Sequence, residues 1–193
     1  AIVVDAGATV GDTDSSDFAG GQLTVDFAFG GTADDRLAIR DQGIGSGQIG
    51  VSGSDVTYNA GAGAVVIGNW SGGSGTVPLV VELNANASLL AVQAMLRNVT
   101  FANVSDSPSG VSRTVRFVVT DGDGGTSNAA TKAVNVSPVN DAPTLNLGIG
   151  GGTYYENATG VYIDTLATVT DADGVDFDGG VLTTWVSNNG TAD

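Results

Sequence analysis

The stretch TVGDTDSSDFAGGQLTVDFAF, residues 9–29, is the most informative part of the chain for the fold. Its second half, residues 23–29, alternates apolar and polar side chains, which predicts a β-strand with one buried face. Its first 16 residues, 9–24, recur 159 residues later as TVTDADGVDFDGGVLT, residues 168–183, with ten of 16 aligned positions identical. GTAD at 31–34 and at 190–193 matches at the same offset, so no gap intervenes. The chain therefore contains a tandem repeat.

Other segments also have the composition of strands. Residues 114–120 place Val115, Phe117 and Val119 on one face. Shorter candidates lie at residues 77–83, 134–136 and 161–163. Glycine-rich turns such as residues 72–75 separate these strands, and no alternation of strands with helices is present. The pattern predicts an all-β sandwich.

One segment has helical periodicity instead. Leu89, Val92 and Leu96 recur at helical spacing, and Ser88 is a suitable N-cap. We expect a short helix that covers one end or edge of the sandwich with its apolar face in the core.

The composition excludes several functional classes. The formal net charge is -15 and only six Lys and Arg are present, so nucleic acid and anionic membrane surfaces are not expected partners. No apolar run is long enough to insert into a membrane. The chain has no cysteine and no histidine, which excludes thiolate nucleophiles, zinc–thiolate sites and histidine bases. We expect a protein that is not an enzyme.

The acidic residues favour calcium as a ligand. Only Glu82 and Glu156 are Glu, and all other acidic residues are Asp, in a chain with 30 Gly. Polar turns rich in Asp supply the oxygen ligands that Ca²⁺ takes. Asp-x-Asp pairs, which can turn two carboxylates toward one point, occur at Asp12 and Asp14, Asp121 and Asp123, and Asp171 and Asp173. The alternatives are that these residues serve solubility or cap turns, as Asp121 and Asp123 could do at a glycine hairpin.

A linker divides the chain. The segment SPVNDAP, residues 137–143, contains two prolines that stiffen the backbone. We expect a first repeat at 1–137 that lacks its first strand, a Pro-rich linker at 138–143, and the N-terminal part of the next repeat at 144–193. A stiff linker predicts a fixed geometry between repeats.

The motifs NDAP at 140–143, TDGDGGT at 120–126 and DADG at 171–174 together resemble the cadherin-like tandem repeats of large bacterial surface adhesins of the type I-secreted RTX class. The resemblance implies an all-β, cadherin-like or immunoglobulin-like β-sandwich with one short helix, followed by a partial second repeat. It implies a Ca²⁺ cofactor at the junction between neighbouring repeats, held by Asn140, Asp141, Glu156, Asp171 and Asp173. It further implies an extracellular location on the bacterial cell surface and a structural role in cell adhesion or biofilm cohesion.

Two other functions remain open. The first repeat lacks a counterpart of residues 153–157, so another copy could donate a strand to its open edge and build a filament. We expect residues 144–193 to pack on that edge or on a neighbouring chain. Trp70, expected in a turn at residues 68–71, could stack on a glycan in a calcium-dependent carbohydrate-binding module, or it could cover the core. Trp185 is expected in the core of the second repeat.

Overall fold

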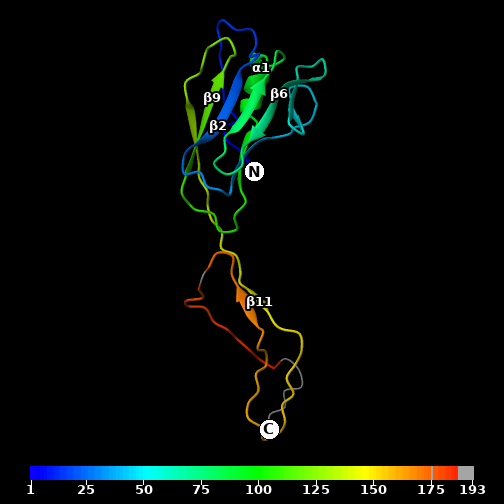
Figure 1. The fold of residues 1–193 in the computed structure, drawn as a ribbon, viewed down its shortest axis with the longest axis vertical. Helices are drawn as coiled ribbons and strands as arrows, with labels where there is room; N and C mark the ends of the chain where they lie inside the picture. Colours follow the sequence, from blue (N-terminus) through cyan, green and yellow to red (C-terminus); the bar gives the residue numbers. More distant parts are fainter. Residues whose placement is uncertain (175, 187–193) are drawn as a thin grey trace. The chain divides into compact units, whose positions relative to one another are not determined.

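The structure, a computed structural model, describes residues 1–174 and 176–186 (Figure 1). The chain forms two compact units, unit 1 (Ala1–Pro138) and unit 2 (Val139–Asp193). The last part of the second repeat copy, GTAD at 190–193, lies outside the described residues.

Unit 1 is an antiparallel all-β sandwich with one short helix, which confirms the predicted fold class. The smaller sheet has the strand order β1 (Ile2–Val3), β8 (Val99–Asn103), β3 (Asp35–Ile39). The larger sheet has the order β10 (Ala130–Val134), β9 (Arg113–Thr120), β2 (Gln22–Phe29), β7 (Leu79–Leu83), β6 (Ala64–Gly72), β5 (Asp55–Asn59), β4 (Ile49–Ser52). Figure 1 shows β9 next to β2, with β6 farther across this larger sheet.

The predicted alternation in β2 and β9 forms the centre of the core. Leu23 and Val25 of β2 are fully buried, and they lie opposite Val119 and Phe117 of β9. Burying each such side chain contributes roughly 1.5–3 kcal/mol to stability. The predictions for residues 23–29 and 114–120 are therefore confirmed.

The two sheets meet through aromatic packing. Phe27 of the larger sheet and Phe101 of the smaller sheet lie edge to face, with ring centroids 6.0 Å apart. This geometry is one that the charge distribution of aromatic rings favours.

The predicted helix is present as α1 (Leu89–Leu96). Its N-cap is Ser88, whose Oγ accepts a hydrogen bond from the backbone N–H of Ala91 at 3.3 Å. The buried side chains of α1 are Ala91, Val92, Met95 and Leu96. Leu89, at the first position of α1, was expected on the buried face with Val92 and Leu96, but its side chain is 37% exposed.

Three local predictions are wrong or shifted. Strand β10 (Ala130–Val134) shares only Val134 with the strand predicted at 134–136. Residues 161–163 do not form a strand, and their side chains are exposed. Trp70 lies within β6, where it pairs with Val81 of β7, and not in a turn.

The turns at Asp17 and Asp176, which are equivalent in the repeat, have the same local backbone structure. Asp17 Oδ1 accepts a hydrogen bond from the N–H of Ala19 at 3.0 Å, and its counterpart Asp176 accepts one from Asp178 at 3.1 Å. The glycines that follow, Gly20 and Gly179, have φ angles of 79° and 78°. These turns are thus specified by the residues that recur.

Burial differs between the copies. Leu23 is 0% exposed in unit 1, whereas its counterpart Leu182 is 79% exposed in unit 2. In unit 1, β7 and β9 pair with β2 on both sides, but the described part of unit 2 contains a single strand pair, β11 (Thr144–Asn146) with β12 (Thr168–Thr170). The prediction that Trp185 is a core residue is wrong for the same reason, since it is 77% exposed.

Candidate functional site

The Asp12 loop is a turn held by its own carboxylate. Asp12 Oδ1 accepts hydrogen bonds from the backbone N–H groups of Asp14, at 3.2 Å, and of Ser15, at 3.1 Å. These bonds, with that from Ser15 the stronger, hold the pKa of Asp12 below its ordinary value. The Asp12 side chain therefore stays ionised and faces inward over the loop.

The Asp121 loop, which follows β9, has the same design. Asp121 Oδ1 accepts from the N–H groups of Asp123, at 2.8 Å, and Gly125, at 2.9 Å. A Cβ atom at Gly125 would lie 2.1 Å from Asp121 Oδ2, so only glycine fits beside this carboxylate. Asp121 does cap a glycine-rich turn, as one interpretation of the sequence expected.

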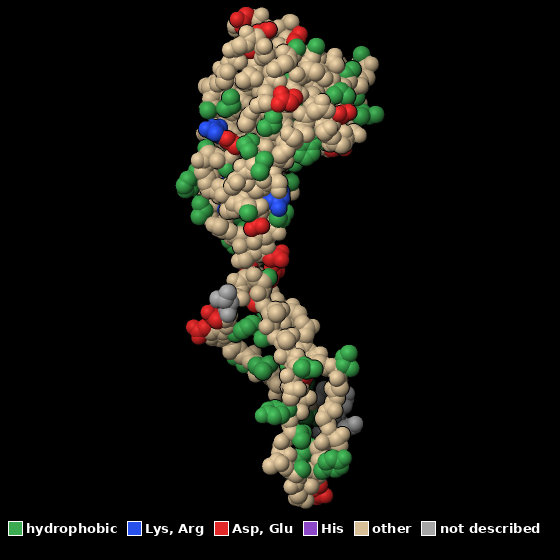
Figure 2. Space-filling view, in the orientation of Figure 1, with side chains coloured by type: hydrophobic (Ala, Val, Ile, Leu, Met, Phe, Trp, Pro, Cys, Tyr) green, Lys and Arg blue, Asp and Glu red, His purple; other side chains and the backbone are tan. Residues whose placement is uncertain are grey.

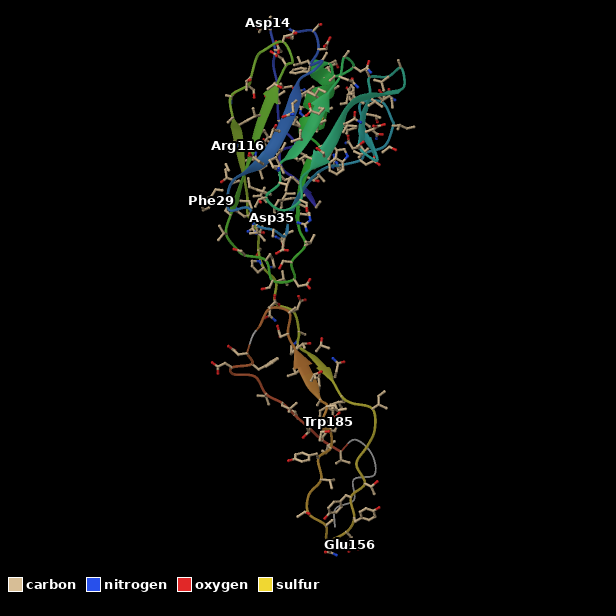
Figure 3. All side chains as sticks on the ribbon, in the orientation of Figure 1. Asp14, Phe29, Asp35, Arg116, Glu156 and Trp185 are labelled. Atoms are coloured by element: carbon tan, nitrogen blue, oxygen red, sulfur yellow. The ribbon has the colours of Figure 1, made fainter. Side chains whose placement is uncertain are left out.

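The structure brings these two loops together at one end of unit 1. Ser15 Oγ donates a hydrogen bond to Asp123 Oδ2 at 3.3 Å, across 108 residues of sequence. Asp12 and Asp121 line one pocket of about 250 Å³, with Phe18 and Val119 among its apolar residues. Figure 2 shows acidic side chains at this end of unit 1, and Figure 3 shows Asp14 there. Sequence reasoning had treated the two motifs separately.

In unit 2 the linker meets the repeated Asp-x-Asp loop. Asp171 Oδ1 accepts from the N–H groups of Asp173 and Gly174, both at 2.9 Å, as Asp12 does in unit 1. Asp173 Oδ2 in turn accepts the backbone N–H of Asp141 at 2.5 Å. The side-chain amide of Asn140 donates to the carbonyl of Asp141 at 2.7 Å. Four of the five predicted junction residues thus belong to this loop or to the linker segment that it contacts.

Glu156, the fifth, lies elsewhere in unit 2. It occupies a turn whose next residue, Asn157, has a φ of 61°. Figure 3 shows Glu156 at the end of unit 2 away from the β11–β12 pair. The described structure does not bring Glu156 to Asp141 and Asp173.

The oxygen atoms of these loops suit a hard cation in their chemistry. Carboxylate, hydroxyl and backbone carbonyl oxygens are the ligands that Ca²⁺ takes, and it requires six to eight of them. In both repeat copies, the loop binds backbone N–H groups through one carboxylate oxygen of its first Asp. Within residues 1–174 and 176–186, no three acidic side chains are gathered closely enough to form a metal cluster. The paired segments therefore supply the oxygen atoms that Ca²⁺ prefers: the Asp12 loop with the Asp121 loop in unit 1, and the Asp171 loop with the linker in unit 2. Within the described residues these atoms do not form a complete coordination site.

Sequence reasoning missed a buried ion pair. Arg113 Nε lies 3.0 Å from Asp35 Oδ2, and both side chains are fully buried. Asp35 also accepts hydrogen bonds from the backbone N–H of Thr32, at 2.8 Å, and from Asn103 Nδ2, at 2.7 Å. Burial alone would raise the pKa of Asp35, but these hydrogen bonds outweigh it, so the pKa lies below its ordinary value.

A sequence signal for this pair did exist. Arg113 is in phase with Val115, Phe117 and Val119, the buried face of β9. An arginine on a buried face requires an acidic partner. The pair joins β3 of the smaller sheet to β9 of the larger sheet, away from the Asp12 loop (Figure 3).

Trp70 is committed to the fold of unit 1. Its Nε1 donates to the carbonyl of Gly53 at 3.1 Å, and its half-buried ring packs against the core.

No helix in the described part of the chain is long and apolar enough to cross a membrane. Comparison of the chain with models of known protein families, with curated proteins and with solved structures finds no match.

Proposed function

We propose that this chain is a calcium-stiffened structural repeat of an extracellular bacterial adhesin or surface fibre, which supports cell adhesion or biofilm cohesion without catalysing a reaction. One observation carries the proposal. In both repeat copies the Asp-x-Asp loop is hydrogen-bonded to a second acidic segment. In unit 2, Asp173 accepts a hydrogen bond from the backbone N–H of Asp141 in the linker. In unit 1, Ser15 beside the Asp12–Asp14 loop donates a hydrogen bond to Asp123. The adhesin assignment rests on the resemblance of these motifs to bacterial cadherin-like repeats.

The physical reason for a cation is electrostatic. Each contact brings two acidic segments together in a chain whose formal net charge is -15. Ionised carboxylates that are gathered in neighbouring segments repel one another. A bound Ca²⁺ neutralises them and supplies the missing attraction, so the linker becomes rigid where the ion is present. Outside the cell, where calcium is abundant, such a repeat folds and stiffens.

Thermal unfolding tests this function. At free calcium about 100-fold above the dissociation constant, one site adds about 2.7 kcal/mol to the free energy of unfolding. Magnesium at the same concentration has little effect, because it resists dehydration into an irregular set of carboxylates. The measurement is calorimetry of the full chain in calcium, in magnesium and in chelator.

Asp173→Asn locates the site, because it removes the charge that faces the N–H of Asp141. We expect a weaker calcium response in this variant. Asp106→Asn is the matched control, since Asp106 is exposed and lies outside all the loops discussed. A melting temperature equal in calcium and chelator rejects calcium binding, and an unchanged titration in Asp173→Asn removes that residue from the site.

A further inference from the structure

Four Asp-Gly pairs occur in the chain, and all of them lie in loops outside the strands. They are Asp121–Gly122, Asp123–Gly124, Asp173–Gly174 and Asp178–Gly179. In such a pair the backbone nitrogen of the glycine can attack the Asp side chain, because glycine has no Cβ atom to obstruct the approach. The ring closes only if the peptide group between the two residues can turn toward the carboxyl carbon. The contacts around each pair therefore decide which of the four reacts.

The Asp121–Gly122 pair is held in place. Asp121 Oδ1 accepts hydrogen bonds from the backbone N–H groups of Asp123, at 2.8 Å, and Gly125, at 2.9 Å. A Cβ atom added at Gly122 would lie 2.0 Å from the carbonyl oxygen of Ala19, so this glycine packs directly against the backbone of another loop. Rotation of the peptide group between Asp121 and Gly122 would disturb these hydrogen bonds and this packing.

Both pairs in unit 2 are also held. The N–H of Gly174 donates a hydrogen bond to Asp171 Oδ1 at 2.9 Å, so the nitrogen that would attack Asp173 is engaged. The Asp178–Gly179 pair lies in a turn that is closed by a hydrogen bond of 2.8 Å, from the N–H of Gly180 to the carbonyl that precedes the pair. In each pair, ring closure would cost a hydrogen bond that the folded chain makes.

The Asp123–Gly124 pair is the least restrained of the four. Within the described residues the N–H of Gly124 donates no hydrogen bond, and a Cβ atom added at this glycine would meet nothing within 4 Å. Its φ angle of 109° lies in the region that glycine adopts freely. The carboxylate of Asp123 accepts a hydrogen bond from Ser15 Oγ at 3.3 Å, which does not involve the peptide group. The peptide group after Asp123 can therefore turn toward the side chain.

We propose that Asp123 is a site of spontaneous isomerisation to isoaspartate in the folded protein. The backbone nitrogen of Gly124 forms a bond to Cγ of Asp123 and gives up its proton, and one carboxylate oxygen leaves as water with that proton and one from solvent. Water then adds to the backbone carbonyl carbon of Asp123 and breaks its bond to the Gly124 nitrogen, and the new carboxyl group returns a proton to solvent. The main chain now runs through Cγ, and the free carboxylate is on Cα. The protein keeps its mass, and water is the only other reactant.

Isomerisation at this position separates the two acidic loops of unit 1. The main chain becomes one methylene longer, and the carboxylate, now attached directly to Cα, reaches one methylene less far. The carboxylate therefore moves away from Ser15, whose hydrogen bond to Asp123 joins the two loops. This inference goes beyond the proposed function, because it sets a lifetime for the loop contact and holds without a bound ion.

Peptide mapping of the aged chain tests the proposal. The full chain is incubated in chelator at neutral pH, either folded or in concentrated urea, and is then cleaved after Arg116 and Lys132, so that one peptide contains both Asp121 and Asp123. Electron-transfer fragmentation distinguishes isoaspartate from aspartate at each position. In the folded chain we expect isoaspartate to form at least about tenfold faster at Asp123 than at Asp121, because the Asp123 peptide group is free to reach the attacking geometry. In urea we expect the two rates to become similar.

Equal rates at the two positions in the folded chain overturn the proposal, and so does a ratio in urea equal to that in the folded chain. Asp123→Glu is the matched control, since its longer side chain requires a larger ring. If this variant yields an isomer at position 123 at the wild-type rate, the assignment is wrong. Because the incubation is done in chelator, its result does not depend on calcium binding, and a negative result leaves the calorimetric test of the proposed function unaffected.

Discussion

Replacing Asp35 by Asn removes a negative charge from the interior of unit 1 while keeping the size of the side chain. Asp35 and Arg113 are fully buried, and the carboxylate accepts three hydrogen bonds, from Thr32, Asn103 and Arg113. The amide has one oxygen, so its NH₂ group must face one of three donors. Arg113 then remains buried with its charge unopposed. Only the carbonyl groups of Ser109 and Val111, which accept hydrogen bonds from Arg113 Nη1, then face the guanidinium, and Nη2 has no hydrogen-bond partner.

The magnitude follows from this geometry. Breaking a buried pair by removing one partner costs about 3–5 kcal/mol, because the remaining charge stays out of water. Natural domains have a free energy of unfolding of about 5–15 kcal/mol, so Asp35→Asn is expected to remove a large share of the stability of unit 1.

Urea unfolding followed by tryptophan fluorescence measures this loss. Trp70 is half-buried in unit 1 and reports its unfolding, whereas Trp185 is 77% exposed in the folded protein and changes little. The matched control is Asp26→Asn, which breaks an ion pair with Arg116 whose side chain is 45% exposed. Exposed pairs contribute little to stability. If Asp35→Asn and Asp26→Asn shift the urea midpoint equally, the buried pair does not hold the sheets together as argued.

Two further predictions concern the same units. Leu23→Ala should cost about 2–5 kcal/mol, because Leu23 is fully buried between β7 and β9, whereas Leu182→Ala at the equivalent repeat position should change stability by less than about 0.5 kcal/mol. Comparable losses in urea unfolding would show that unit 2 has a core of its own. The second prediction concerns acid. Because the pKa of Asp35 is lowered in the folded state, its contribution is present above the unfolded value of about 3.9 and is lost as the pH falls through the lower folded pKa. The difference in stability between the wild type and Asp35→Asn should therefore shrink below about pH 4. A pH-independent difference contradicts this account.

The sandwich could be predicted because its central strands carry their burial pattern in sequence. In β2 and β9 apolar residues recur at every second position, and Leu23, Val25, Val115, Phe117 and Val119 are buried on that face. The helix could be predicted because its cap and its apolar spacing are local signals. The prediction of a strand at residues 161–163 failed because a suitable composition does not by itself provide a neighbouring strand for pairing. Its counterpart β1 exists only where β8 pairs with it.

The candidate site could be predicted only in its local parts. Each Asp-x-Asp motif was found from sequence, since its turn depends on residues two or three positions away. The contact between Ser15 and Asp123 could not be found, because it depends on how β2 and β9 pair in space. The partner of Arg113 could not be predicted for the same reason, because Asp35 lies on a distant strand. The need for an acidic partner could be predicted, because Arg113 alternates with the buried residues of β9.

In the two repeat copies the acidic turns depend on local sequence, whereas the burial of side chains depends on strands distant in sequence. Asp12 and Asp171 form the same hydrogen-bonded turn, although Asp12 belongs to the sandwich of unit 1 and Asp171 follows a single strand pair in unit 2. Phe18 is 3% exposed and its counterpart Phe177 is 46% exposed, because burial depends on strands that are distant in sequence. The acidic turns can therefore form before the sandwich around them is complete. A cation that binds such a turn in unit 1 would join loops 108 residues apart and stabilise the folded sandwich. In unit 2 the same turn would hold the linker through Asp141, so one recurring sequence could serve both stability within a repeat and stiffness between repeats.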